Sequence, residues 1–259
     1  MSETIRADWY RPKFVLVGDG KQAEKHRKAI ENIGGQIVYV YDPVKNPAEG
    51  DGRPTTERTL SKYLDMADWA VIVSPNYLHY QHTKFILRHR GIQVIVEKPL
   101  NMPWEPTIDD NRVNIVLQFR YLNLPETADT VKVTAVRPPD YFKTWKGNER
   151  MTGGIFYHLF VHYIDLAIMM GAKFEGQLLS EGEQERLILG KSGDILYDLT
   201  KIDMQLLYNT MYVRVVNGNG GIKPRDIFYL NWIMNKYSMK YEGGSPYRVS
   251  MDEWRMNLV

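Results

Sequence analysis

A lysine at the end of a buried strand is the first residue of this chain that could do chemistry. Residues 94–96 form a short β-branched run that stops abruptly at Glu97, Lys98 and Pro99. Such a run is typical of a parallel strand that delivers side chains to a cleft at its carboxyl end. An amine held there can take a proton from a substrate hydroxyl. Because the tripeptide alone is common, its meaning depends on the elements that position it.

The first of these elements is a glycine turn between a strand and a helix. Residues 13–17 are an apolar strand, and Gly18-x-Gly20-x-x-Ala23 follows directly. Residues 22–33 then carry apolar side chains at helical spacing. The glycines permit a tight turn and let a pyrophosphate approach the amino end of the helix. This pattern predicts a dinucleotide site, the alternative being a glycine turn in an ordinary α/β protein.

An acidic residue completes the dinucleotide pattern. The second strand, residues 36–41, ends at Asp42, about twenty residues beyond the turn. A carboxylate there can accept hydrogen bonds from a ribose diol, and its charge repels a 2′-phosphate. We therefore expect NAD rather than NADP, although Lys45 lies close enough to complicate the charge argument.

The rest of the first half alternates between helices and strands. This alternation implies right-handed crossovers and a doubly wound parallel sheet of the Rossmann type. We expect helices over residues 56–65 and 77–90, and strands over residues 69–73, 92–96 and 113–117.

After residue 130 the pattern changes to an α+β domain with a mostly antiparallel sheet. We accordingly expect a dinucleotide-binding domain over residues 1–122 and a substrate-binding and oligomerisation domain over residues 123–259. The expected elements of this half are a helix within residues 153–170 and strands over residues 131–136, 202–208, 212–216, 226–233 and 237–241.

Histidines offer two further kinds of chemistry. His162 and Asp165 lie three residues apart, so they share one face of the apolar helix predicted there. Without further context, a histidine in such a helix is most simply a satisfied core residue. His79 and His82 have the same spacing and could bind a metal, but no further ligand cluster of fitting spacing accompanies them. We therefore expect no metal site.

Composition excludes several classes of protein. The 259 residues include 33 basic and 31 acidic side chains, and this net charge of +2 gives no reason to expect nucleic acid or an anionic membrane as a partner. The chain has no cysteine, so disulfides, thiolate metal sites and thiol nucleophiles are excluded. We expect a soluble, cytoplasmic protein.

Four motifs in order resemble the glucose–fructose oxidoreductase/inositol dehydrogenase (Gfo/Idh/MocA) superfamily. The resemblance covers about residues 13–171 and implies an NAD-dependent sugar dehydrogenase. The motifs are Gly18-x-Gly20-x-x-Ala23, Ser74-Pro-Asn76-x-x-His79, Glu97-Lys98-Pro99 and the segment from Gly153-Gly154 to His162-x-x-Asp165.

A closer resemblance is to enzymes that oxidise C3 of UDP-N-acetylglucosamine or its uronic acid. It rests on residues 74–80, 117–120 and 141–148, above all on Trp145-Lys146-Gly147. It implies a 3-keto product in surface-polysaccharide sugar biosynthesis, an aminotransferase that acts on this product, and a homo-oligomer, either dimer or tetramer. The alternatives are a free-sugar or inositol dehydrogenase and an NAD-binding regulatory member without turnover.

The resemblance also assigns roles to residues of this chain. Lys98 is implied to be the catalytic lysine, and His162 the general base or its hydrogen-bonding partner. The residues implied to bind the cofactor are Gly18, Gly20, Ala23, Asp42, Ser74, Asn76, His79, Glu97 and Gln118. Those expected against the substrate are Arg120, Lys146 and Arg150 at the diphosphate, Tyr141 and Trp145 at the uracil or sugar, and Asp165 at the sugar hydroxyls.

The chain departs from the family pattern at three places. His158 replaces an acidic or amide residue, and Phe160 replaces a glycine, which predicts a narrower pocket. The connection over residues 100–113 is too short for the helix that the family places there.

Overall fold

A computed structural model describes most of the first half of the chain and parts of the second. The described residues are 11–42, 44, 57–122, 134–135, 143–154, 157–158, 161–169, 175–181, 184–189, 203–228, 230–231, 234 and 248–250. The chain divides into two compact units. The first unit comprises Met1–Gln118 and Asp203–Asp226, and the second comprises Phe119–Ile202 and Ile227–Val259. This division differs from a single cut at residue 122, because a late segment returns to the first unit.

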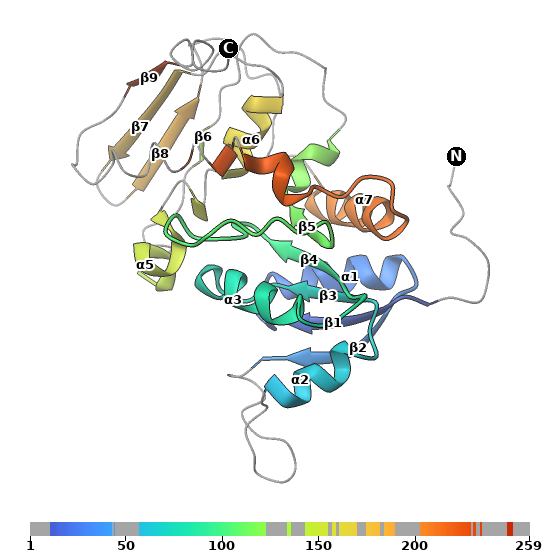
Figure 1. Cartoon of the computed structure of the whole chain (residues 1–259). Helices are drawn as coiled ribbons and strands as arrows, with labels where there is room; N and C mark the ends of the chain where they lie inside the picture. The colour runs from blue at the N-terminus through green and yellow to red at the C-terminus, as the bar shows by residue number, and fades with distance from the viewer. Residues whose placement is uncertain are drawn as a thin grey trace. The chain divides into compact units, whose positions relative to one another are not determined.

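The first unit contains a five-stranded parallel sheet in the order β2-β1-β3-β4-β5 (Figure 1). This confirms the predicted Rossmann-type sheet. Its core lies along the central strands, where β-branched and other apolar side chains are buried on both faces. The strands are β1 (Lys13–Val17), β2 (Gln36–Tyr41), β3 (Trp69–Ile72), β4 (Gln93–Glu97) and β5 (Val113–Val116).

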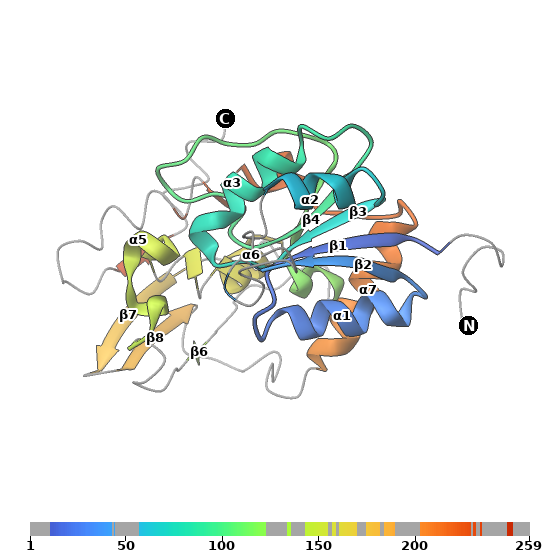
Figure 2. The ribbon, with the colours of Figure 1, turned by 90° about the horizontal axis from the view of Figure 1, so that it is seen from below.

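Helices cover both faces of this sheet (Figure 2). The helices α2 (Glu57–Leu64) and α3 (Asn76–Ile86) lie on one face. The helices α1 (Ala23–Asn32) and α7 (Met204–Val216) lie on the other. Within the described part of the chain, no helix is long and apolar enough to cross a membrane.

The helix α7 corrects the sequence prediction, which placed strands over residues 202–208 and 212–216. The side chain of Asp203 caps the helix, because its Oδ1 accepts hydrogen bonds from the backbone N–H groups of Gln205 and Leu206 at 2.9 and 3.2 Å. The apolar positions then follow a helical stripe, with Leu207, Tyr208, Met211, Tyr212 and Val215 buried. The β-branched and aromatic residues suggested strands, but this spacing and the cap favour the helix.

The connection between β4 and β5 is short, as predicted. All of residues 98–112 are described, and they form turns and bends without a helix. Beyond β5, residues Gln118–Tyr121 form the 3-10 helix η1.

The described part of the second unit contains an antiparallel sheet in the order β6-β8-β7-β9. Its strands are β6 (Thr134–Ala135), β7 (Glu175–Glu181), β8 (Gln184–Leu189) and β9 (Arg248–Ser250). Its helices are η2 (Trp145–Gly147), α5 (Glu149–Thr152) and α6 (Val161–Met169).

The strand predicted over residues 226–233 is wrong. Residues Pro224–Ile227 form the 3-10 helix η5, and the described residues that follow, Phe228, Leu230 and Asn231, are helical. The strand predicted over residues 237–241 lies outside the described residues.

Candidate active site

The glycine turn after β1 has the geometry that a dinucleotide site needs. Gly18 has φ +103°, a conformation that other residues rarely adopt, and a Cβ there would lie 2.7 Å from the backbone nitrogen of Ser74. At Gly20 a Cβ would meet nothing within 4 Å, so space lies open above the turn. Helix α1 begins at Ala23, which is buried. The turn thus presents the amino end of α1 beside open space, which fits a pyrophosphate.

Asp42 holds this turn in place from the end of β2. Its Oδ2 accepts a hydrogen bond from the backbone N–H of Asp19 at 2.8 Å, and its Oδ1 accepts one from Val44 at 2.9 Å. Arg27 of α1 donates to the side chain of Asp19 at 2.6 Å. A carboxylate oxygen has two lone pairs, so Asp42 can accept ribose hydroxyls in addition to these bonds.

Lys98 lies at the carboxyl edge of the same sheet. It follows Glu97, the last residue of β4, and its peptide bond to Pro99 is cis. In the strand order, the glycine turn follows β1, Asp42 follows β2 on one side of it, and Lys98 follows β4 on the other. A dinucleotide whose adenosine ribose lies on Asp42 therefore extends toward the lysine with its nicotinamide end.

His79 joins the loops that follow β3 and β4. Its Nδ1 lies 2.7 Å from the carbonyl oxygen of Pro99, and its Nε2 lies 2.7 Å from that of Ser74. Burial lowers the pKa of His79, although these two carbonyl contacts oppose the shift. The imidazole thus contacts backbone through both nitrogens, and it supports the cofactor edge rather than presenting a metal ligand.

The neighbouring His82 and Asn76 lie on the same helix. The Nδ1 atom of His82 lies 2.9 Å from the hydroxyl oxygen of Ser74. Burial, with a smaller contribution from His79, lowers the pKa of His82 to about 4. Asn76 is buried at the start of α3. The described residues contain no group of three or more acidic or histidine side chains that could hold a metal ion.

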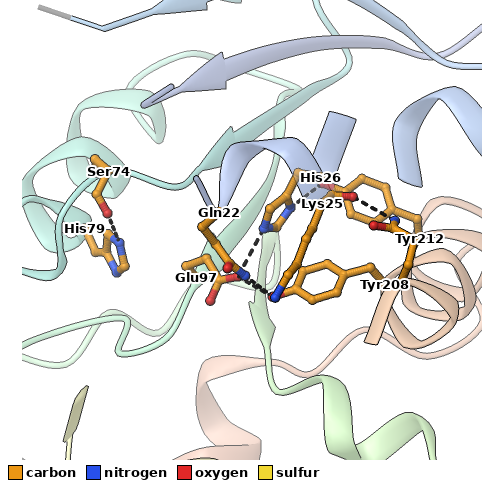
Figure 3. Close-up of polar contacts among 9 residues, drawn as sticks. Gln22, Lys25, His26, Ser74, His79, Glu97, Tyr208 and Tyr212 are labelled. Atoms are coloured by element: carbon orange, nitrogen blue, oxygen red, sulfur yellow. Dashed lines mark hydrogen bonds and ion pairs between the residues drawn. The ribbon is translucent and has the colours of Figure 1, made fainter. Parts of the chain in front are cut away.

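Glu97 is the centre of a buried polar cluster that the sequence analysis missed (Figure 3). Its Oε1 accepts hydrogen bonds from Gln22 Nε2 at 2.8 Å and from the Tyr208 hydroxyl at 2.7 Å. The Nε2 atom of His26 lies 3.1 Å from the same oxygen. On its other side, His26 Nδ1 lies 2.7 Å from the hydroxyl of Tyr212. We call these five residues the Glu97 cluster.

The cluster keeps Glu97 ionised. Burial alone raises the pKa of Glu97, but the hydrogen bond and charge of His26, the charge of Lys98 and the hydrogen bond of Tyr208 together lower it well below its usual value. Burial and the charge of Glu97 raise the pKa of Tyr208 and Tyr212 well above 10. Both phenols are therefore neutral at physiological pH. The sequence signals for this cluster were the position of His26 on the apolar face of α1 and the four-residue spacing of Tyr208 and Tyr212.

Gln118 supplies a polar atom that fits the nicotinamide end. Within the described part of the chain, its buried Oε1 has no hydrogen-bond partner. An unsatisfied buried acceptor is costly, so a donor such as the carboxamide of nicotinamide fits there. The open turn at Gly20, the carboxylate of Asp42 and this acceptor match the three parts of NAD. The residues of the first unit therefore fit this cofactor.

In the second unit, two residues expected to contact substrate, Arg120 and Asp165, bind each other. Arg120 donates from Nε to Asp165 Oδ2 at 2.8 Å and from Nη2 to Oδ1 at 2.5 Å. The Asp165 side chain is only 1% exposed. Burial raises the pKa of Asp165, whereas the hydrogen bonds and charge of Arg120 oppose this shift. His162 lies one turn before, on the same helix, with its ring 5.4 Å from that of Phe119.

The segment around Trp145 forms a second group in this unit. Trp145 begins η2, and its ring lies edge-on to His158 at 5.5 Å. Lys146 is half-buried, and Arg150 is exposed. Tyr141 and Phe160, which the sequence analysis also singled out, lie outside the described residues.

A parallel Rossmann sheet, with a glycine turn that fits a dinucleotide and a lysine at its carboxyl edge, defines a dinucleotide-dependent oxidoreductase. Comparison with protein families agrees with this class. Residues 12–109 match the "Oxidoreductase family, NAD-binding Rossmann fold" model, and residues 127–212 match the "Oxidoreductase family, C-terminal alpha/beta domain" model. The chain belongs to the Gfo/Idh/MocA oxidoreductase family.

Solved structures share this fold at low sequence identity. The WlbA (WbpB) dehydrogenase of Thermus thermophilus, solved with NAD and α-ketoglutarate, has TM-score 0.60 and 21% identity over 86% of this chain and 94% of its own. The WlbA dehydrogenase of Chromobacterium violaceum, solved with NADH and UDP-GlcNAcA, has TM-score 0.54 and 16% identity over 93% and 96%. The UDP-N-acetylglucosamine 3-dehydrogenase GnnA of Acidithiobacillus ferrooxidans has TM-score 0.52 and 12% identity over 90% and 97%.

Proposed function

We propose that this protein is an NAD-dependent dehydrogenase that oxidises the C3 hydroxyl of a UDP-linked N-acetylated hexose or hexuronate. The observation that supports NAD-dependent oxidation is the order of groups along the carboxyl edge of the sheet. Asp42, the Gly18 turn and Lys98 follow β2, β1 and β4, so a dinucleotide on this edge has its reactive end toward the lysine.

In this proposal, each side chain of the site has a distinct role in the reaction. NAD, when bound, supplies a hydride acceptor at its nicotinamide ring. The amine of Lys98 takes the proton of the sugar hydroxyl as the hydride leaves the carbon. Glu97, ionised and buried beside the lysine, sets the local charge. In this proposal, His162 assists as a base or as a hydrogen-bonding partner of the base.

Two lines of support favour a UDP-sugar as the substrate. The first is the group of aromatic and basic side chains around η2, which includes Trp145, Lys146 and Arg150. Aromatic rings stack on uracil or sugar faces, and cationic side chains bind diphosphate oxygens. The second is the shared fold with dehydrogenases whose structures contain UDP-GlcNAcA or whose names specify UDP-N-acetylglucosamine.

Turnover with a panel of sugars tests this proposal. Purified protein with NAD would be given UDP-N-acetylglucosamine, its uronic acid, free glucose or inositol, and NADH absorbance would be followed. 2-Oxoglutarate would be added in parallel as a hydride acceptor, because bound NADH that does not leave would hide turnover. We expect turnover with a UDP-sugar only. Turnover confined to free polyols would overturn the substrate assignment, and NAD binding without any turnover would overturn the enzymatic one.

Substitution of the lysine tests the catalytic assignment separately. Lys98→Ala should reduce turnover by about 10²–10⁴-fold, the usual contribution of general base catalysis, while NAD binding persists. Lys28→Ala, at an exposed position of α1, is the matched control and should retain full activity. Loss of NAD binding in Lys98→Ala would mean that the lysine is structural.

A further inference from the structure

The Glu97 cluster is built from two pairs of residues, each one helical turn apart. Gln22 and His26 come from the start of α1, and Tyr208 and Tyr212 come from α7. Figure 3 shows Gln22, His26 and Tyr208 around the Glu97 carboxylate at the end of β4, with Tyr212 on the other side of His26. His26, Tyr208 and Tyr212 have no exposed surface. A cluster at this place adjoins the candidate catalytic lysine in sequence and the cofactor turn through Gln22.

The hydrogen bonds of the cluster run in one direction, toward the carboxylate. A carboxylate only accepts, so Gln22 and the hydroxyl of Tyr208 donate to it. His26 donates from Nε2 to the carboxylate, and its Nδ1 lies 2.7 Å from the hydroxyl of Tyr212, which accepts from a charged imidazole and donates to a neutral one. In either form, the contact with Tyr212 holds the ring with Nε2 toward Glu97. Three donors thus converge on a single oxygen.

We propose that His26, Tyr208 and Tyr212 are positioning residues that tune Lys98 through Glu97. This inference rests on the proposed function, in which Lys98 acts as the base. An ionised Glu97 alone would stabilise the ammonium form of Lys98, which cannot accept a proton. The donors aimed at Glu97 place positive ends of dipoles around it and so weaken its attraction for the ammonium. The cluster therefore keeps the lysine closer to its reactive, neutral form.

The substitutions that test this proposal leave the other charged and titratable groups near the cluster unchanged. His79 on α3 interacts with both Glu97 and Lys98 through space. Lys25 on α1 lies over the ring of Tyr208, 5.6 Å from its centroid. Among the described residues, the titratable groups that interact with Glu97 or Lys98 include His26 on α1, Tyr208 and Tyr212 on α7, and His79 on α3.

The proposal predicts pH shifts of opposite sign for two kinds of variant. Tyr208→Phe removes a donor, so the pKa of Lys98 rises and the acid limb of the kcat/KM profile moves up by about half to one pH unit. The activity lost at pH 7 should then return at higher pH. Glu97→Gln removes the negative charge, so the limb should move down. His26→Leu also removes a donor and should shift it as Tyr208→Phe does, and Tyr212→Phe should give a smaller shift of the same sign.

An activity-independent measurement separates this proposal from the proposed function. The rate at which acetic anhydride labels Lys98 would be followed against pH by mass spectrometry of the intact, folded protein, because only the neutral amine reacts. The midpoint should rise in Tyr208→Phe and fall in Glu97→Gln. If these shifts appear but no sugar is oxidised, the tuning stands and the enzymatic role fails. If sugar is oxidised without these shifts, the tuning fails alone.

Matched controls distinguish tuning from a loss of packing. Tyr63→Phe alters a tyrosine on α2 that stacks on Tyr39, and His89→Gln alters a histidine that bonds to Asp65. Both should leave the labelling midpoint of Lys98 unchanged. Melting temperature and NAD affinity would be measured for every variant. The proposal would be overturned if Tyr208→Phe folds and binds NAD but leaves the labelling midpoint of Lys98 unshifted. It would also be overturned if Tyr208→Phe and Glu97→Gln shift that midpoint in the same direction. Where Tyr208→Phe fails to fold, His26→Leu and Glu97→Gln provide the same comparison of signs.

Discussion

Arg120 and Asp165 form a two-point ion pair within the second unit, through Nε–Oδ2 and Nη2–Oδ1 contacts of 2.8 and 2.5 Å. The aspartate is almost completely buried, whereas 19% of the arginine side chain is exposed. The pair therefore joins η1 to the middle of α6. In this arrangement Asp165 directs the guanidinium, and the guanidinium neutralises a carboxylate that water cannot reach.

Removal of Arg120 should destabilise the protein strongly. Arg120→Leu leaves the buried carboxylate of Asp165 without its partner, and the free energy of unfolding should fall by about 3–5 kcal/mol. Urea denaturation would measure this change. Arg225→Leu is the matched control, because Arg225 and Asp226 form an exposed pair 4.0 Å apart, and its effect should stay below about 0.5 kcal/mol. Equal effects of the two substitutions would contradict the structural role of the Arg120–Asp165 pair.

The two glycines of the cofactor turn should respond differently to alanine. Gly18→Ala combines a positive φ with a Cβ only 2.7 Å from Ser74 N, so it should cost about 2–4 kcal/mol of stability. Gly20→Ala meets no atom and should leave stability within about 0.5 kcal/mol, yet its Cβ occupies the space expected for the pyrophosphate. Thermal unfolding and NAD titration of each variant would separate the two effects.

A third glycine provides the control for backbone strain. Gly34→Ala, at φ +70° with no atom within 4 Å of its Cβ, should cost only about 1 kcal/mol and leave NAD binding intact. An NAD affinity unchanged in Gly20→Ala would show that no phosphate lies above the turn.

The choice between NAD and NADP should depend on Asp42. Asp42→Ala should weaken NADH binding by about tenfold, because the carboxylate accepts hydrogen bonds from the ribose hydroxyls of NADH. NADPH binding should weaken by less, because the same carboxylate repels the 2′-phosphate of NADPH. Fluorescence titration with both reduced cofactors would give the ratio. Asp42→Asn keeps an acceptor oxygen without the charge, so it should recover part of the NADH affinity. Equal losses for both cofactors in Asp42→Ala would remove Asp42 from the ribose site.

Acidification should destabilise the first unit through His82. Its pKa of about 4 in the folded protein lies below the usual 6.5, so the unfolded chain binds a proton more readily. Stability is therefore complete above about pH 6.5 and falls as the pH drops toward 4, by about 2 kcal/mol between pH 7 and pH 5. His82→Gln should remove this part of the pH dependence. Urea denaturation at the two pH values would measure it.

Local patterns predicted the first half of the chain well. The strands over residues 13–17 and 36–41 have the predicted bounds, and the glycine turn and Asp42 lie where the motifs indicated. These features depend on residues close together in sequence, such as a β-branched run before a turn. The same patterns placed Lys98 at the sheet edge, because parallel strands present their carboxyl ends together.

The Glu97 cluster could not be predicted because its members come from distant parts of the chain. His26 and Tyr212 are 186 residues apart, and neither belongs to a motif. The aromatic and β-branched residues of α7 also resemble two short strands when each is considered alone. The aspartate at residue 203 and the spacing of Tyr208 from Tyr212 were the available signals for a helix.

The return of α7 to the first unit makes the cofactor domain discontinuous in sequence. During synthesis, residues 1–118 leave the ribosome well before the helix that covers one face of their sheet. Until Val216 has been made, His26 and Glu97 lack their phenol partners, and the apolar surface of α1 lacks its cover. The domain therefore reaches its final form only late in translation, and a fragment ending at Gln118 should be prone to aggregation when expressed alone.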